Sequence, residues 1–325
     1  MGSYLLRRTG LLLLSLALAV TVLFVVLRLL GNPVYALINL EATPEDIRAA
    51  SAALGVDRPI FVQFADYIGG LFRGDLGTSF SSHLSVSDEI LRRLNVTVPL
   101  TLISFALSVI IAIPVGFIAA WKSRTWYGTA FSAISQLGGA IPVFWVGILL
   151  VTLFALNLGV LPAGGFPRQD WADPLDALTS LTLPVLTIAI VSGSELARYV
   201  RSATLDILDR DYLRTARALG QPFSTALWRH ALRNGIVPVI SILAIQLATT
   251  FVGAVVVENV FALPGLGDML IAGIRQQDFP NVQGVLLFST VLVLVIGFLG
   301  DVLQRLLDPR LRSSLSGNRR VKASA

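Results

Sequence analysis

Few side chains in this sequence of 325 residues are suited to covalent or metal chemistry. With no cysteine, the chain cannot form disulfides, thiolate metal sites, iron–sulfur clusters or a catalytic thiol. It has two histidines, His83 and His230, so a histidine-rich metal site is not expected. Ser194, beside Gly193, raises the alternative of an intramembrane hydrolase, but neither histidine is placed to act as its base. Small residues at 192–194 are more typical of close helix packing.

Nucleotide hydrolysis is also not expected of this chain. A phosphate-cradling loop needs the pattern Gly-x-x-x-x-Gly-Lys-Ser/Thr, and the two lysines, Lys122 and Lys322, both lie outside it. We therefore expect no enzyme activity and no cofactor in this chain, so that any ATP and magnesium would be bound by partner subunits.

The basic stretch at 197–235 is the part of the sequence that says most about function. Its apolar positions recur at helical spacing, at Leu205, Leu208, Tyr212, Thr215 and Leu219. Gly220 is placed to end that helix and Pro222 to begin another. The pattern predicts a helix, a sharp turn and a second helix beside a membrane, although a solvated basic loop is the simpler alternative.

The composition places these residues in a membrane protein. Hydrophobic residues make up 54% of the chain and charged residues 14%, against about 25% charged in a typical soluble domain. We predict an all-α integral membrane protein with six transmembrane helices, at roughly Gly10–Leu30, Val98–Ala120, Ala130–Leu158, Leu178–Leu196, Ile236–Val257 and Val285–Leu307. The first run continues too far for a cleaved signal peptide, which favours a retained anchor.

Arginine and lysine placement predicts the orientation. If the N-terminus is cytoplasmic, the inside segments hold 16 cationic residues and the outside segments hold 7. Because cations near span ends favour the cytoplasm, we place both termini there.

The segment after the first span has the pattern of a small helical unit. Thr43-Pro44-Glu45-Asp46 indicates a helix start, Ile60 to Phe72 an amphipathic helix, and Ser85 to Leu94 a third short helix. The predicted organisation is an N-terminus with the first span at 1–30, an extracytoplasmic helical segment at 31–97, a five-span core at 98–312 with the loop 197–235, and a polar tail at 313–325.

Charged groups near the spans are few. For Arg28 and Glu195, close to span ends, extension of the side chain to the interface is the simplest explanation. Asp301 lies deeper, where it would serve a helix contact or the transport pathway. A secondary transporter is an alternative, but it would be expected to show internal repeats or broken helices with ionisable groups, and we find no convincing repeat.

The order of residues in the basic stretch resembles the coupling loop of permease subunits in binding-protein-dependent ABC importers. The similarity rests on Asp211-Tyr212-Leu213-Arg214-Thr215-Ala216-Arg217-Ala218-Leu219-Gly220, followed by Pro238. Arg214, Thr215 and Ala216 stand where the family has Glu-Ala-Ala. This departure is similar to the peptide-transporter branch, as are Gly74-Asp75-Leu76-Gly77, Glu258 with Pro264-Gly265-Leu266-Gly267, and Leu307-Asp308-Pro309-Arg310.

The resemblance, which runs from about Tyr4 to Arg312, implies a B-type permease of a dipeptide or oligopeptide importer. It implies a homologous second permease, one or two P-loop ATPase subunits or domains, an extracytoplasmic peptide-binding protein and no nucleic acid as partners. Residues implied to couple to the ATPase are Arg214, Thr215, Ala216, Arg217, Ala218, Gly220, Pro222 and Pro238. Residues implied to contact the binding protein are Asp75, Glu258, Pro264, Gly265 and Gly267. Nickel or glutathione is an alternative cargo, because the family includes such importers.

Overall fold

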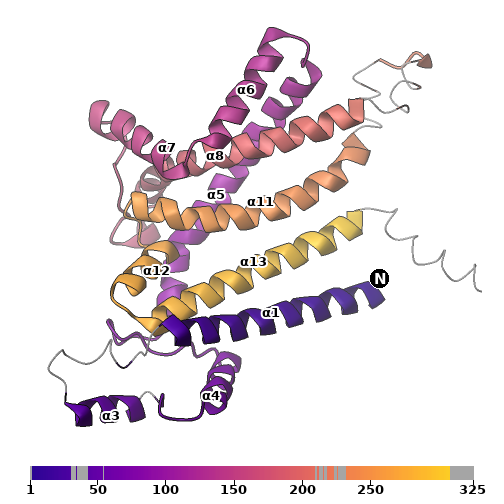
Figure 1. The fold of residues 1–325 in the computed structure, drawn as a ribbon. Helices are drawn as coiled ribbons and strands as arrows, with labels where there is room; N and C mark the ends of the chain where they lie inside the picture. Colours follow the sequence, from indigo (N-terminus) through magenta and orange to yellow (C-terminus); the bar gives the residue numbers. More distant parts are fainter. Residues whose placement is uncertain are drawn as a thin grey trace, which may run out of the picture.

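The computed structural model describes residues 2–30, 34, 43–53, 55–208, 211, 215, 218–222, 225 and 232–307. The regular elements of this part of the chain are helices, with one isolated antiparallel bridge between Thr78 and Ser85. In chain order they are α1 Gly2–Leu30, α3 Pro44–Ala53, α4 Ile60–Phe72, α5 Val86–Trp121, α6 Trp126–Ala140, α7 Val143–Leu150, the π-helix Val151–Asn157, the 3₁₀ turn Asp170–Ala172, α8 Pro174–Leu208, α11 Leu232–Val260, α12 Leu266–Arg275 and α13 Phe279–Leu307 (Figure 1).

Five of these helices, α1, α5, α8, α11 and α13, are long and apolar enough to cross a membrane. The predicted third span, Ala130–Leu158, is not one straight helix. It is broken between α6 and α7, which meet at an angle of 101°, so the described residues have six spans only if this bent pair counts as one. The break is at Ile141, which is extended because the residue before a proline, here Pro142, avoids the helical region.

The second span is longer than predicted, whereas the third is broken. The short helix expected at 85–94 is continuous with the span that follows, so the boundary at 97/98 falls inside α5. Pro99 would be expected to interrupt this helix, because it has no N–H to donate to the carbonyl of Asn95. The indole N–H of Trp171 donates to that carbonyl instead, at 2.8 Å, so the oxygen is paired and the helix continues.

The core of the molecule is built on α5 and α8, which pack against each other along much of their length. Gly116 permits the close approach, since a β-carbon there would lie 2.5 Å from the carbonyl oxygen of Ala197. Apolar side chains of α11 complete the core around this pair. Its buried members include Val96 and Leu100 of α5, Leu181 and Ile188 of α8, Ala254 and Val257 of α11, and Phe261 just after α11. The predicted loop boundaries at 197 and 235 fall inside helices, because α8 runs on to Leu208 and α11 begins at Leu232.

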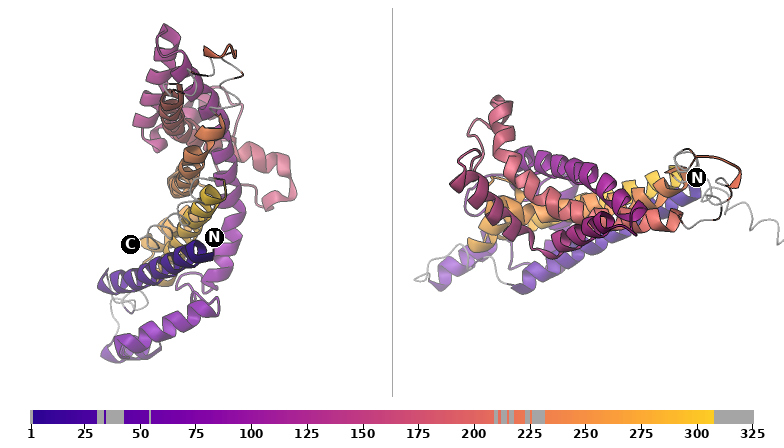
Figure 2. Two further views of the ribbon diagram at one scale, coloured as in Figure 1. Left: turned by 90° about the vertical axis from the view of Figure 1, so that its right-hand side faces the viewer. Right: turned by 90° about the horizontal axis from the view of Figure 1, so that it is seen from above.

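The first helix packs against the last. Arg8 forms an ion pair of 3.0 Å with Asp301, and the guanidinium of Arg305 lies 3.9 Å from the ring centroid of Tyr4. Asp301 therefore makes a helix contact, one of the two roles the sequence left open. The start of α1 and the end of α13 lie at the same end of the bundle, here called the loop end because α8 ends and α11 begins there (Figures 1 and 2). The opposite end, which carries α3, α4 and α12, is called the α12 end.

Candidate functional sites

At the loop end, the described part of the basic stretch has the predicted turn. The hydroxyl of Thr215 donates to the carbonyl of Asp211 at 2.9 Å, and the amide of Leu219 donates to the carbonyl of Thr215 at 3.0 Å. Both bonds have the spacing of a helix. Gly220 then has a φ of +83°, which ends the helical path.

Glycine is required at 220 by conformation and not by crowding. A β-carbon built there would have no heavy atom within 4 Å, but a positive φ is strained for residues with a β-carbon. Thr215, Ala218, Gly220 and Pro222 are exposed, and Pro238 lies within α11. Arg214, Ala216 and Arg217 lie outside the described residues. The exposed turn thus offers a surface whose shape depends on a single backbone conformation.

At the α12 end, the carboxylate of Glu258 joins three helices. Its side chain, at the end of α11, is fully buried, at 0% exposure. One carboxylate oxygen accepts the hydroxyl of Thr97, from α5, at 2.6 Å, and the other accepts the amide of Gly267, in the first turn of α12, at 2.6 Å. The hydroxyl oxygen of Thr97 in turn accepts the amide of Leu266 at 2.9 Å. Two amides that begin α12 are therefore paired by side chains of other helices.

The two glycines of the sequence Pro-Gly-Leu-Gly make room for this arrangement. A β-carbon at Gly265 would lie 2.2 Å from the carboxyl carbon of Glu258, and one at Gly267 would lie 2.5 Å from the α-carbon of Val255. On the exposed side, Arg93 of α5 forms an ion pair of 2.9 Å with Asp268 of α12. The helix α12 is therefore fixed to α5 and α11 from its first residues.

These contacts separate the residues implied to meet a binding protein into two kinds. Asp75 is exposed and Pro264 partly exposed, so both are accessible. Glu258, Gly265 and Gly267 are buried, and the structure gives them the internal role of holding α12. Sequence reasoning missed Thr97 and Arg93. A threonine beside an apolar run and an arginine shortly before it gave no signal that either would reach a segment some 170 residues later.

A second buried carboxylate, Asp278, holds the loop 78–84 at the same end. It lies just before α13 and accepts the hydroxyl groups of Ser79 at 2.6 Å and Ser81 at 2.8 Å, and the backbone amide of Ser81 at 3.2 Å. Burial by itself raises the pKa of this carboxyl, but the donated hydrogen bonds outweigh burial, and the pKa of Asp278 lies below its ordinary value. The ionised form therefore stabilises the loop.

Ser194 has a packing role. Its hydroxyl donates to the carbonyl of Ile190 at 2.6 Å, and a β-carbon on Gly138 of α6 would lie 2.2 Å from that hydroxyl oxygen. His83 is at the α12 end, away from the middle of α8, and His230 lies outside the described residues. This geometry supports the interpretation of Ser194 as a small residue at a helix contact.

Comparison with known proteins identifies the family. Residues 112–313 match the binding-protein-dependent transport system inner membrane component, and residues 1–101 match the N-terminal region of that membrane component. The chain belongs to this family. Its members are non-catalytic membrane subunits, so the hydrolase alternative is wrong and the absence of enzyme activity is confirmed. The secondary transporter alternative is also wrong, because the family consists of permeases of binding-protein-dependent ABC importers.

Relatives cover nearly the whole chain. The oligopeptide transport system permease protein AppB of Bacillus subtilis is 35% identical, over 96% of this chain and 99% of its own. The di/tripeptide transport system permease protein DppB of Pseudomonas aeruginosa is 32% identical, over 96% and 99%. The glutathione transport system permease protein GsiC of Salmonella choleraesuis is 36% identical, over 96% and 99%. Among solved structures, the inward-facing MetNI methionine ABC transporter matches with a TM-score of 0.56 at 18% identity, over 68% of this chain and 96% of the matched chain. This supports the all-helical permease fold.

The contact between Thr97 and Leu266 gives the first prediction. Replacing Thr97 with valine keeps the shape but leaves the amide of Leu266 and one oxygen of Glu258 unpaired, a cost of about 1–3 kcal/mol in the free energy of unfolding. Hydrogen exchange of the Leu266 and Gly267 amides should become faster and the melting temperature should fall. Thr101→Val is the matched control, one turn further along α5, because the hydroxyl of Thr101 is buried without a hydrogen bond to the described residues. Equal effects of the two variants would contradict the role given to Glu258.

The lowered pKa of Asp278 gives a second prediction. Its contribution to stability is complete above the ordinary carboxyl pKa of 3.8 and is lost as the pH falls through the lower value of the folded protein. Asp278→Asn should therefore lower the melting temperature at neutral pH, and the difference from the unmodified protein should shrink in acid. Asp57→Asn, at an exposed aspartate, is the control. A pH-independent difference for Asp278→Asn would show that the carboxylate charge is not what stabilises the loop.

Proposed function

We propose that this chain forms, with a homologous second permease, the membrane path through which an ATP-driven importer takes up di- or oligopeptides. The observation that carries the proposal is the full-length similarity to permeases whose names specify oligopeptides and di/tripeptides. A relative named for glutathione is compatible with it, since glutathione is itself a tripeptide. Nickel is less favoured, because no group of three histidine, cysteine or acidic residues among the described positions is arranged to hold a metal.

The two ends of the bundle have different proposed partners. The excess of arginine at the loop end supports a cytoplasmic position for it, and for both chain termini. The exposed turn at Gly220 would dock on an ATPase subunit, which would bind ATP and magnesium. The α12 end would then face outward and receive the peptide-binding protein. Asp75 and Pro264 are accessible for that contact, and Glu258, Gly265 and Gly267 would support it from behind.

An uptake assay tests the function. Liposomes that contain the assembled importer should accumulate labelled dipeptide only with internal ATP and the external binding protein, because this chain has no energy source of its own. Labelled glutathione and labelled nickel are supplied in the same way, and a comparison of the three uptake rates identifies which compound is transported. Peptide uptake by this chain alone, without ATP or the binding protein, would overturn the proposal.

The turn at Gly220 gives a separate prediction for coupling. Gly220→Leu places a branched side chain at φ +83°, which costs about 1–2 kcal/mol and should change the turn while the membrane helices stay intact. The expected phenotype is an inserted permease that loses its ATPase or hydrolyses ATP without moving peptide. Gly220→Asn is the matched control, since asparagine tolerates the left-handed region and should keep most of the uptake. Normal uptake and normal ATPase binding by Gly220→Leu would restore the simpler alternative of a solvated basic loop.

A further inference from the structure

Helix α4 exposes an apolar face that no described residue covers. Phe61 is 72% exposed and Phe72 is 89% exposed, and Ala65 lies between them on the same side of the helix. The other side of α4 packs against the first span. The rings of Phe64 and Tyr67 lie 5.2 Å and 5.7 Å from the ring of Phe24.

The contact with Phe24 fixes the depth of α4 relative to the membrane. Phe24 is one helical turn before Arg28, the last charged residue of α1, or roughly 6 Å along the helix axis. An arginine at the end of a span lies at the headgroup level, so the rings that contact Phe24 lie near the boundary between headgroups and acyl chains. Figures 1 and 2 show α4 beside this end of α1, on the side away from the rest of the bundle. At that depth and on that side, Phe61 and Phe72 would face lipid.

A cavity of about 690 Å³ opens between α1, α4, the loop 78–83 and the start of α13. Its size is typical of a small-molecule site. Phe24, Leu27 and Phe279 form apolar parts of its wall, whereas Arg28 and Arg58 bring two guanidinium groups to it. An apolar wall beside two cations suits a ligand with a hydrocarbon part and an anionic group.

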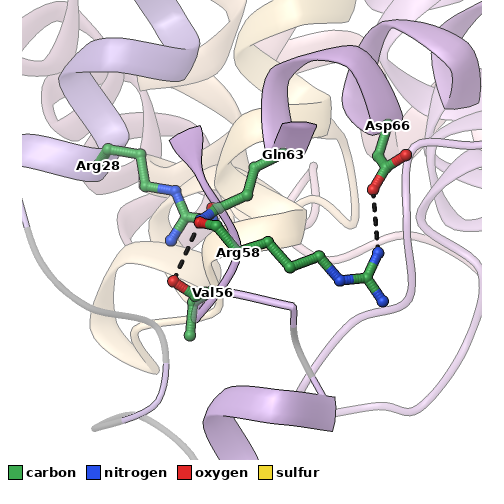
Figure 3. A network of polar contacts seen from close by, with 5 residues as sticks. All are labelled: Arg28, Val56, Arg58, Gln63 and Asp66. Atoms are coloured by element: carbon green, nitrogen blue, oxygen red, sulfur yellow. Dashed lines mark hydrogen bonds and ion pairs between the residues drawn. The ribbon is translucent and has the colours of Figure 1, made fainter. Parts of the chain in front are cut away.

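The polar side chains of the cavity are arranged so that Arg28 keeps its charge available. The amide nitrogen of Gln63 donates to the carbonyls of Val56, at 3.1 Å, and Arg58, at 2.7 Å, which directs the amide oxygen of Gln63 toward Arg28 (Figure 3). That oxygen accepts from the guanidinium but carries no charge. Among the described residues, no carboxylate forms an ion pair with Arg28.

The second guanidinium is only loosely neutralised. Arg58 pairs with Asp66 at 3.3 Å, and both side chains are more than half exposed, so the pair is weak. The cavity lining contains these two arginines and one aspartate, which leaves one positive charge. An anion that enters the cavity is therefore attracted by a lining with a net positive charge.

We propose that this cavity binds an anionic phospholipid, with the phosphate at Arg28, an acyl chain along Phe24 and Leu27, and the Phe61–Phe72 face of α4 inserted among neighbouring lipids. With the α12 end facing outward, as proposed above, this lipid comes from the outer leaflet. If the α12 end faced the cytoplasm, the lipid would come from the inner leaflet. The site would anchor the segment that precedes α5 to the bilayer.

Retention of lipid by the assembled importer tests the site. The complex, purified with its partner subunits and loaded with a mixture of phosphatidylglycerol and phosphatidylcholine, should keep phosphatidylglycerol in native mass spectrometry. Arg28→Gln should lower this retention about tenfold, the usual effect of losing one charge-assisted hydrogen bond. Arg28→Lys should keep most of it. Arg48→Gln, which removes an exposed arginine of α3 outside the cavity lining, should change nothing.

Three results would overturn the proposal in this assay. The first is equal retention of the two lipids by the unmodified complex. The second is equal loss of phosphatidylglycerol from the Arg28→Gln and Arg48→Gln variants. The third is displacement of phosphatidylglycerol by inorganic phosphate at low millimolar concentration, which would identify a soluble anion as the ligand. Transport is not measured, so a failure here is distinguishable from a failure of the proposed function.

Site-directed labelling tests the depth of α4 independently. Because the sequence has no cysteine, Phe61→Cys, Phe72→Cys and the control Ser82→Cys each give a single labelling site in this chain. Spin labels at 61 and 72 should be relaxed by lipid-soluble oxygen and not by a water-soluble nickel complex, whereas the label at 82 should show the reverse. Labels at 61 and 72 that are relaxed by the nickel complex, or shielded from both reagents by a partner subunit, would overturn the proposal.

Discussion

The buried carboxylate of Glu258 is the interaction on which the α12 end depends. Removing a carboxylate from water costs several kcal/mol unless hydrogen bonds replace the lost hydration. Here they come from Thr97 and Gly267, on helices α5 and α12 that are far apart in the sequence. The same carboxylate pairs an amide that α12 could not pair within itself. The hydrogen bonds of the buried Glu258 side chain and those at the start of α12 depend on each other, so the three helices meet in one arrangement.

The prolines of the bundle show how the surroundings decide what a helix breaker does. Pro142 separates α6 from α7, and the extended residue before it turns the chain. Pro99 leaves α5 continuous, because Trp171 pairs the carbonyl that the proline ring leaves without its N–H. In a membrane, an unpaired carbonyl cannot turn to water, so the indole of Trp171 stabilises the continuous form of α5 at Pro99.

Helix α8 connects the two ends of the molecule. Its 35 residues extend for roughly 50 Å, from the α12 end to Leu208 at the loop end. Close packing on α5, made possible by Gly116, and on α6, made possible by Gly138, leaves little freedom to bend.

The sequence by itself determined the class of the protein and the identity of most helices. Apolar runs of spanning length need no partner to be recognised, because the bilayer imposes their length, and the amphipathic pattern of Ile60 to Phe72 gave the bounds of α4. The glycine at the basic turn was also predictable, since its reason is local: a positive φ depends on that residue's own backbone.

Only the tertiary structure decided which polar residues act together. The family resemblance implied that Glu258 contacts a binding protein, but it is buried, and its burial depends on helices that a local pattern does not include. Thr97, Arg93, Ser79 and Asp278 have ordinary sequence surroundings, and their roles come from neighbours about 170 to 200 residues away. The continuity of α5 through Pro99 likewise depends on a distant donor, the indole of Trp171, whereas the break before Pro142 has a local cause in the proline itself.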